Sequence, residues 1–241
     1  MFVPPFPPRE PPGTEIRFPD LASLGSGPTR DVVAVGEDFR PGTLLSAYRA
    51  GIFPWPHGDP GDEDFAVLWF CPDPRAIFPL DAPPRWSRSL RRTLRIHPFE
   101  ITVDQDFEGV VRACGDTRES TWITPELTAG YLGLHHHGFA HSVEVWERSQ
   151  DGAQRSLVGG IYGVTVGAVF CGESMFHTRT DASKIAFASL VSVLNRCNYT
   201  LFDVQVMNPH LASLGCVPVP RRDYLQRLVA AEKAPLPFVW H

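Results

Sequence analysis

Long apolar runs are absent from this 241-residue sequence, in which no segment approaches the length of a membrane-spanning helix. The first residues also lack the basic and apolar regions of a secretory signal, so we expect a cytoplasmic protein. Cysteine is scarce as well. The five cysteines are odd in number and form no Cys-x-x-Cys pair, which argues against both a disulfide framework and a zinc site. Free thiols and no metal ion are the expectation.

An excess of basic residues is also absent, since the formal net charge is −5 at pH 7. Broad affinity for nucleic acid usually needs a basic surface, so general nucleic-acid binding is not expected. Residues 85–95 differ, because they hold five arginines and no acidic residue. Helical spacing places four of these on one side: Arg88, Arg91, Arg92 and Arg95. The opposite side is apolar, so the segment predicts a docked helix with a cationic outer face.

Proline is concentrated at the start of the chain, where seven of the 24 prolines fall within the first twenty residues. Residues 1–30 are therefore expected to form a mobile or draped arm. Residues 31–98 mix short strand patterns with a helix at 43–49 and the arginine-rich helix, which predicts a small N-terminal α/β domain. A second domain is expected over residues 99–228, with a short tail at 229–241.

The pattern over residues 99–228 predicts a mixed α/β domain. Thr124 and Pro125 favour a helix start, with a capping hydroxyl and a proline in the first turn, and Gly138 is its predicted stop. Strands are then expected at 142–147, 157–164, 166–174 and 201–206, and a long helix at 182–197, before the last strand. This order is compatible with an N-acetyltransferase-like (GNAT) sheet and helix fold.

Polar residues in the last of these strands indicate a site. Period-two alternation directs Phe202, Val204 and Val206 to one face and Asp203 and Gln205 to the other, so the polar face is expected to line a site. Glu173 lies among small and apolar residues in the strand at 166–174, where a carboxylate is costly unless it has a partner.

Several blocks, in this order, resemble the leucyl/phenylalanyl-tRNA–protein transferases, and the resemblance runs from about residue 31 to residue 225. The blocks are Ala47–Trp55, Cys71–Arg75, Thr121–Pro125, Ala140–Trp146, Phe170–Phe176, Asp181–Lys184 and Leu201–Gly215. The resemblance implies an enzyme that moves leucine or phenylalanine from tRNA to proteins beginning with Arg or Lys and so marks them for degradation, with methionine left open as a third donor. It implies a GNAT-like fold, a monomer and no cofactor.

The resemblance also implies an apolar pocket for the donor side chain and the terminal adenosine, formed by Trp55, Trp122, Ile161, Phe170 and Met175. An apolar side chain gains about 25 cal/mol per Å² that it buries, and a tryptophan face can stack on adenine. Strict alternation would put Phe170 and Glu173 on opposite faces, so a shared role requires a bulge or strand end near Gly172.

Three polar residues carry the expected chemistry. Gln205 is expected to orient the attacking amine or the ester carbonyl, and Asp203 to hold and polarise Gln205 or help pass the proton on. Glu173 is expected to accept a hydrogen bond from the donor's α-amino group or from a ribose hydroxyl. The arginine-rich helix either contacts tRNA phosphates or is a solvated surface helix. Lys184 either contacts phosphate or pairs with Asp181.

Two alternatives stay open. A non-catalytic module could bind the tRNA end or a protein N-terminus, although Glu173, Asp203 and Gln205 together argue against it. A coenzyme A-dependent N-acetyltransferase would need a basic residue and a glycine-rich turn before the helix at 182–197, and none is present. The chain departs from the family at Phe70-Cys71, where Trp-Ser is usual, and at Val204, where Cys is usual. The histidines at 135–137 point apart on a helix and do not suggest a metal site.

Overall fold

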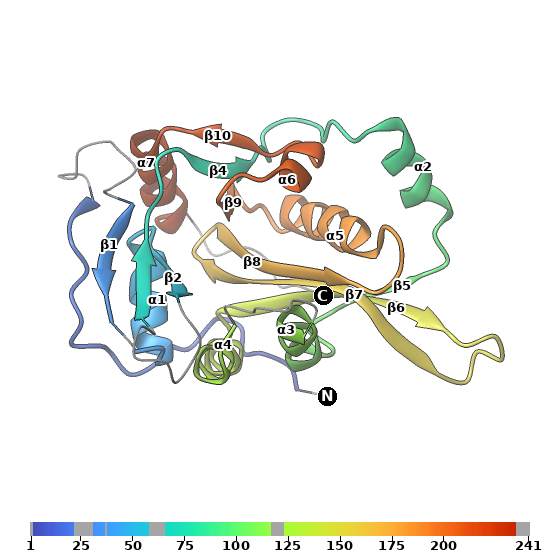
Figure 1. Ribbon diagram of the computed structural model, residues 1–241, viewed down its shortest axis with the longest axis horizontal. Helices are drawn as coiled ribbons and strands as arrows, with labels where there is room; N and C mark the ends of the chain where they lie inside the picture. Colours follow the sequence, from blue (N-terminus) through green and yellow to red (C-terminus); the bar gives the residue numbers. More distant parts are fainter. Residues whose placement is uncertain (1, 22–30, 37, 58–65, 117–122, 235–241) are drawn as a thin grey trace.

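The computed structural model contains two sheets and describes residues 2–21, 31–36, 38–57, 66–116 and 123–234 (Figure 1). From edge to edge, the seven-stranded sheet holds β10 (Val217–Val219), β4 (Arg75–Phe78), β9 (Leu201–Gln205), β8 (Val169–His177), β7 (Arg155–Val166), β6 (Ala140–Arg148) and β5 (Glu100–Val103). The three-stranded sheet holds β1 (Val32–Val35), β3 (Ala66–Phe70) and β2 (Phe53–His57).

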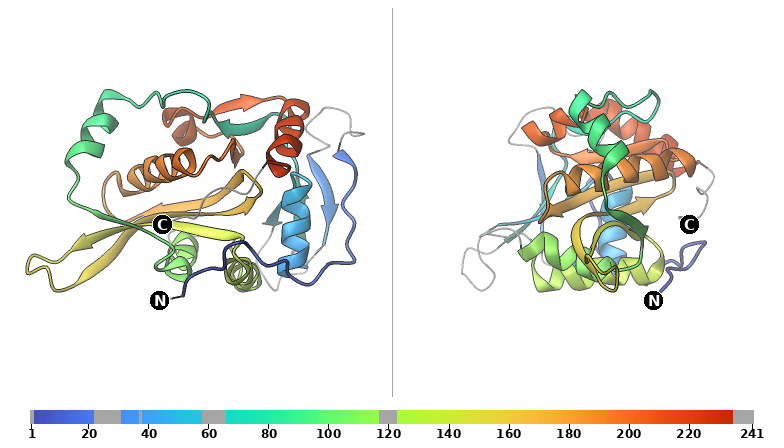
Figure 2. Two further views of the ribbon diagram at one scale, coloured as in Figure 1. Left: turned by 180° about the vertical axis from the view of Figure 1, so that it is seen from behind. Right: turned by 90° about the vertical axis from the view of Figure 1, so that its right-hand side faces the viewer.

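Helices cover both faces of the larger sheet (Figures 1 and 2). One face carries the long α5 (Ala182–Arg196), beside which lie α2 (Arg88–Ile96) and α6 (Pro209–Ser213). The other face carries α3 (Phe107–Asp116) and α4 (Pro125–His137). Two further helices stand toward the smaller sheet: α1 (Pro41–Arg49) and α7 (Arg221–Glu232).

Each face of the larger sheet has its own apolar core. Tyr48 and Tyr131 belong to the core on the side of α1, α3 and α4. Phe187, Phe170 and Phe202 belong to the core beneath α5, where Phe202 packs edge-on against Phe170 at 5.6 Å between ring centroids. The sheet therefore separates two hydrophobic layers, as expected for a domain with helices on both faces.

The local signals of the sequence are confirmed at α4. The Thr124 side chain accepts a hydrogen bond from Leu127 N at 3.2 Å, Pro125 is the first helical residue, and Gly138 ends the helix with a φ of 84°. A left-handed C-terminal residue of this kind favours glycine, because glycine has no Cβ to clash. The five spans expected after residue 140 all correspond to β6, β7, β8, α5 and β9, with ends that shift by a few residues.

The mixed α/β class is confirmed, as is the order of a small N-terminal unit before a larger unit of sheet and covering helices. The acetyltransferase-like fold of the larger unit stays a prediction. The boundary at residue 98 stays a prediction. One strand pairing bears on it, because β4 comes from before residue 98 and is hydrogen bonded between β9 and β10 in the larger sheet. No helix among the described residues is long and apolar enough to cross a membrane.

The described part of the N-terminal arm lies across the helices instead of standing free. Arg9 N donates to His137 O at 2.8 Å at the end of α4, and Glu10 pairs with Arg49 at 2.6 Å at the end of α1. The proline-rich segment has no regular strand or helix of its own, so these contacts fix its course. Of the two expectations for the arm, draped or mobile, the structure matches the first for residues 2–21.

All five cysteines are buried, and none of them forms a disulfide. Burial raises the pKa of four of their thiols: Cys71, Cys171, Cys197 and Cys216, the last to about 12. A thiol with a raised pKa forms little of the reactive thiolate at neutral pH. The prediction of thiols that form no disulfide is confirmed.

One parallel pair gives the sheet an opening. β8 and β9 run parallel and pair only at Val169–Cys171 with Leu201–Asp203, whereas the other paired strands of the described chain are antiparallel. Beyond Cys171 and Asp203 the two strands continue without ladder pairing to each other. Side chains from both strands can therefore reach the space between them.

Candidate active site between β8 and β9

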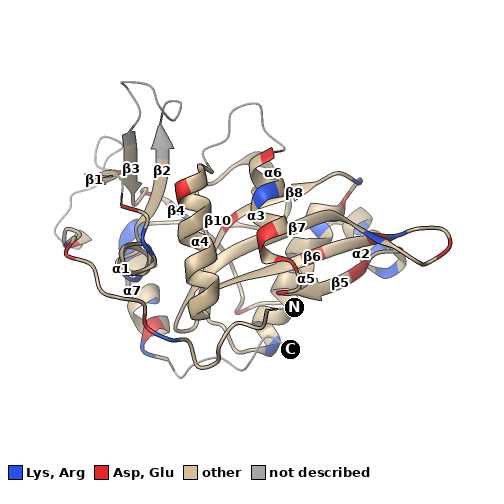
Figure 3. Ribbon diagram, turned by 90° about the horizontal axis from the view of Figure 1, so that it is seen from below, with Lys and Arg blue, Asp and Glu red and all other residues tan. Residues whose placement is uncertain are grey.

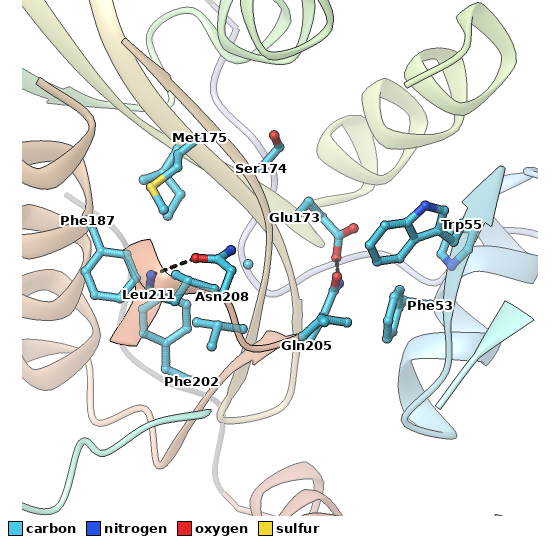
Figure 4. Close-up of a pocket in the computed structure, with 15 residues that line it drawn as sticks. Phe53, Trp55, Glu173, Ser174, Met175, Phe187, Phe202, Gln205, Asn208 and Leu211 are labelled. Carbon is cyan, nitrogen blue, oxygen red and sulfur yellow. Dashed lines mark hydrogen bonds between the residues drawn. The ribbon is translucent and has the colours of Figure 1, made fainter. Parts of the chain in front are cut away.

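A pocket of about 270 Å³ lies where β8 and β9 stop pairing (Figure 4). Its walls are mostly apolar and come from β2, β7, β8, β9, α5 and α6; they include Phe53, Ile161, Met175, Phe187 and Leu211. A few polar groups line it as well: Glu173, Ser174, Gln205 and Asn208. An apolar cavity with a small number of placed polar groups is the usual form of a small-ligand site.

Glu173 lies at a bulge in β8. β7 pairs Tyr162 with Ser174 and Gly163 with Gly172, so Glu173 has no opposite residue. This is the irregularity that the sequence required near Gly172. Residues at such bulges are re-aimed relative to the regular pleat. The Glu173 side chain is thereby directed toward Gln205 and α4.

Both oxygens of Glu173 accept hydrogen bonds. Gln205 Nε2 donates to Oε1 at 2.7 Å, and the Tyr131 hydroxyl donates to Oε2 at 2.8 Å. The hydroxyls of Tyr131 and Tyr48 lie 3.0 Å apart. Burial raises the pKa of Glu173 from 4.5 to about 7, although the hydrogen bonds from the tyrosines oppose the shift. Burial also raises the pKa of both tyrosines well above 10, so they stay neutral donors.

Gln205 has an unusual backbone conformation. Its φ is +64°, and Val206 N donates to Val204 O at 2.9 Å, which closes a three-residue turn centred on Gln205. A turn of this kind with positive φ is rare and strained for a residue with a side chain. It ends β9 and presents the Gln205 amide to Glu173 across the gap between the strands (Figure 4).

Asp203 is fully buried and does not line the pocket among the described residues. Its carboxylate accepts from Arg75 twice, at 2.8 and 2.6 Å, and from the Tyr224 hydroxyl at 2.9 Å. It also accepts from Gln205 N at 2.8 Å. Asp203 is therefore in contact with Gln205, as one of its two expected roles requires, and the contact is made to the Gln205 backbone. Its role in the reaction stays a prediction.

Arg75 is the buried cation opposite Asp203. Its guanidinium lies between the rings of Phe53 and Tyr224, at 4.7 and 4.5 Å from their centroids. Burial opposes the charged form, and the Asp203 carboxylate outweighs it, so the pKa of Arg75 is raised well above its usual value. A buried bidentate pair of this kind is costly to break, because either partner alone would be left as an uncompensated charge.

The predicted alternation in β9 is confirmed up to Gln205, whereas Val206 follows the end of the strand and is 38 % exposed. Phe202 and Val204 pack into the core beneath α5, whereas Asp203 and Gln205 contact Arg75, Tyr224 and Glu173 on the other side.

The predicted apolar residues fall into three groups. Trp55, Ile161 and Met175 line the pocket, and Trp55 is 37 % exposed, with its ring packed beside Phe53 and Phe70. Phe170 is fully buried behind Phe202 and is not part of the described pocket wall. Trp122 lies outside the described residues.

The arginine-rich helix is α2, on which basic residues are blue in Figure 3. All four predicted arginines are exposed. Leu90 is buried on its inner side, and Thr93 donates to Asp181 at 3.3 Å, which joins α2 to the start of α5. No ion pair of these arginines occurs within the described ranges. The cationic outer face predicted from the sequence is confirmed.

Two further expectations concern histidine and lysine. His135 stacks on Phe107 at 4.3 Å, and its Nδ1 lies 2.7 Å from Ala140 O. No cluster of three or more metal-binding side chains exists among the residues with described positions. Lys184 pairs with Asp181 at 2.7 Å, which favours the second of its two interpretations.

Sequence reasoning missed several residues of the site: Tyr48, Phe53, Arg75, Tyr131, Phe187, Asn208, Leu211 and Tyr224. Tyr48, Phe53, Arg75, Asn208 and Leu211 lie inside blocks that carried the resemblance, so a signal was present for them. Tyr131, Phe187 and Tyr224 lie at ordinary helix positions facing the interior, where nothing local distinguishes them from core.

Comparison with known proteins gives two family matches. Residues 77–229 match the model described as leucyl/phenylalanyl-tRNA protein transferase, and residues 37–73 match the model of its N-terminal domain. The gap between the matches contains Arg75. Each match describes what this chain is similar to.

Individual relatives are similar over most of their length. A leucyl/phenylalanyl-tRNA–protein transferase from Shewanella denitrificans is 50 % identical over 199 residues, which cover 82 % of this chain and 80 % of the relative. One from Proteus mirabilis is 46 % identical with the same coverage. Among solved structures, the C-terminal DUF2156 domain of a protein described as a lysylphosphatidylglycerol synthetase, from Agrobacterium fabrum, gives a TM-score of 0.37 at 12 % identity, covering 80 % of this chain and 57 % of that one. A TM-score this low does not establish a shared fold.

Proposed function

This chain belongs to the leucyl/phenylalanyl-tRNA–protein transferase family, and we propose that it moves leucine or phenylalanine from tRNA to the N-terminal Arg or Lys of acceptor proteins. It is an aminoacyltransferase. The observation that most supports this role is the Gln205–Glu173 contact of 2.7 Å at the edge of an apolar pocket. A polar pair at the wall of an apolar cavity suits a reaction in which one end of the donor is apolar and the other is an ester.

The donor binds with its side chain against the apolar wall. Ile161, Met175 and Phe187 provide contacts for a leucine or phenylalanine side chain without a polar partner. Trp55, which is partly exposed at the pocket, offers a face for the terminal adenine, and a stack of this kind is worth roughly 1–3 kcal/mol.

The reaction needs no covalent enzyme intermediate, because the donor is already an activated ester. The acceptor's neutral amine attacks the ester carbonyl carbon, a C–N bond forms and the C–O bond to the ribose breaks. The proton lost by nitrogen passes to the leaving ribose oxygen. An α-amino group has a pKa near 7.7–8.0, so a useful fraction is neutral at physiological pH. The main contribution of the protein is to hold amine and carbonyl in attacking range.

Gln205 has a defined orientation for this task. Its Nε2 donates to the Glu173 carboxylate, so its Oε1 is the atom that can accept a hydrogen bond from the attacking amine. Glu173 fixes the amide and is close enough to the pocket to bind the donor's α-amino group or a ribose hydroxyl. Asp203 acts behind Gln205, through its backbone.

The four exposed arginines of α2 are proposed to contact tRNA phosphates. They form a local basic face on a protein of net charge −5, which suits modest and salt-sensitive binding. The cytoplasmic location, the monomeric state, methionine as a third donor and the degradation of the products stay predictions.

One assay tests donor, acceptor and chemistry together. Radiolabelled Phe-tRNA is incubated with the protein and two acceptors that differ only in their first residue, Arg or Ser. Label should enter the Arg acceptor alone, through a bond that resists mild base. Tight binding of Phe-tRNA without transfer would indicate the non-catalytic module, and acetylation from acetyl-coenzyme A without aminoacyl transfer would indicate the acetyltransferase.

A further inference from the structure

Asp203 uses its carboxylate entirely within the protein. Oδ1 accepts from Arg75 Nε and Gln205 N, and Oδ2 accepts from Arg75 Nη2 and the Tyr224 hydroxyl, at distances of 2.6 to 2.9 Å. These four bonds saturate a carboxylate, which offers about four acceptor positions. Asp203 is fully buried, so it is poorly placed to take a proton from a substrate.

The strained turn at Gln205 needs support. Its φ of +64° would relax toward an ordinary strand value if nothing held it, and the Gln205 amide would then leave Glu173. The hydrogen bond from Gln205 N to Asp203 Oδ1 is the contact that holds the turn from inside. Its geometry depends on where the Asp203 carboxylate sits.

We propose that Arg75 is a positioning residue for the reaction: it fixes Asp203 by a bidentate ion pair, and Asp203 in turn holds Gln205 in the strained conformation that aims its amide into the site. The inference rests on the proposed role of Gln205. Arg75 belongs to β4 and lies 128 residues before Asp203 in the chain, so the contact forms only in the complete fold.

Two aromatic rings fix Arg75 itself. The Arg75 guanidinium carbon lies 4.7 Å from the ring centroid of Phe53 in β2 and 4.5 Å from that of Tyr224 in α7. Phe53 also lines the pocket, and the Tyr224 hydroxyl bonds to Asp203, so each ring has a second link to the site. A planar guanidinium can pair with a carboxylate through two bonds and stack on rings at once, whereas a lysine ammonium cannot.

The test is a double-mutant cycle between Arg75→Lys and Gln205→Ala. Single-turnover rates are measured with phenylalanyl-adenosine and a peptide beginning with Arg, and donor affinity is measured separately. Arg75→Lys should slow the rate about 100-fold, the loss typical of a small misplacement, and leave the donor Kd within about threefold. In the Gln205→Ala background it should cost less than about twofold, because Arg75 acts through Gln205. If Arg75 had a merely structural role, Arg75→Lys would still slow the reaction when Gln205 is already replaced by alanine.

Arg221→Lys is the matched control. Arg221 is also a buried arginine, and it donates to Cys71 O at 2.8 Å and pairs with Asp31 at 3.8 Å. It should leave the rate within about twofold. If Arg75→Lys does not fold, Tyr224→Phe decides the question: it keeps the ring on Arg75, removes one bond to Asp203, and should slow the rate about tenfold, again only when Gln205 is present.

An unchanged rate in Arg75→Lys, or an equal loss with and without Gln205, would overturn the assignment of Arg75 while the proposed function stands. If Gln205→Ala alone left the rate unchanged, the proposed role of Gln205 would fail, and this inference with it.

Discussion

Gln205 and Glu173 join β9 to β8 by a side-chain hydrogen bond of 2.7 Å at the point where the two strands no longer pair through their backbones. Each residue breaks the regularity of its own strand, Glu173 as a bulge and Gln205 at a positive φ. A regular parallel ladder would place backbone groups there and leave no cavity. The two irregularities therefore make the pocket and place its polar groups at the same time.

Replacing Gln205 with alanine should lower the single-turnover rate about 100-fold or more while the Kd for Phe-tRNA changes little. The amide acts on the reacting geometry, whereas most donor affinity comes from the apolar wall and tRNA phosphates. Gln226→Ala, at an exposed position of α7, is the matched control and should behave like the unmodified protein. An unchanged rate with weakened donor binding would make Gln205 a binding residue only.

The rate should rise with pH through about 7, the pKa to which burial raises Glu173. Both oxygens of Glu173 accept hydrogen bonds, an arrangement that suits the ionised carboxylate. Protonation would force Gln205 or Tyr131 to turn away. In Glu173→Gln this limb of the profile should disappear, and only the limb from the acceptor amine near 7.7–8.0 should be left. Superimposable profiles for the two proteins would contradict this role of Glu173.

Glu173 should also make the free energy of unfolding depend on pH. Its pKa is about 7 in the folded protein and about 4.5 when unperturbed, so the folded state binds the extra proton between these values. Stability is therefore highest below about pH 4.5 as far as this group is concerned, falls as pH rises through 7, and levels off above it. Urea denaturation at pH 5.5 and 8 measures the free energy of unfolding of the unmodified protein and of Glu173→Gln. Between pH 5.5 and 8, the unmodified protein should lose stability relative to the variant. A difference that stays constant would contradict the raised pKa.

Reversing charge on α2, with Arg88→Glu and Arg92→Glu together, should weaken Phe-tRNA binding and flatten its salt dependence. Phenylalanyl-adenosine lacks the remaining phosphates of tRNA and should be used as well as before. Arg222→Glu with Arg227→Glu is the matched control, because both are exposed on α7 at the other end of the molecule (Figure 1). Equal losses with both donors would make α2 a structural helix.

Ile161 should set donor size, because it lines the pocket and is only 4 % exposed. Ile161→Ala should improve Trp relative to Leu as donor, and Ile161→Phe should do the reverse. A methyl group in such a pocket is worth about 1–3 kcal/mol, so the preference should shift by degrees. Val164→Ala also removes apolar volume, but from the other core, and should leave the preference unchanged. Competition between tRNAs charged with Leu and with Trp measures this donor preference.

Local sequence patterns predicted the strands and helices that frame the site. The period of β9 placed Asp203 and Gln205 on the correct face, and the conflict between Phe170 and Glu173 correctly required a bulge. Both results follow from backbone geometry that repeats every two residues. The same patterns say nothing about which distant segment a side chain meets.

The contacts missed from the sequence are the long-range ones. Arg75 meets Asp203 across 128 residues and Tyr131 meets Glu173 across 42, and each pair forms only when separate elements pack. Without those partners in view, Asp203 was expected to act on Gln205 or on the transferred proton, and its ion pair with Arg75 was missed. Phe170 was placed in the pocket from its position in a motif, yet alternation carries it into the core beneath α5.

The burial of all five cysteines leaves the surface without a competing thiol. A single cysteine introduced at an exposed position, such as Ser89→Cys on α2, would then be the one site at which a maleimide fluorophore attaches readily. Labelled protein of this kind could report the arrival and departure of tRNA in real time, and no native cysteine would have to be removed beforehand.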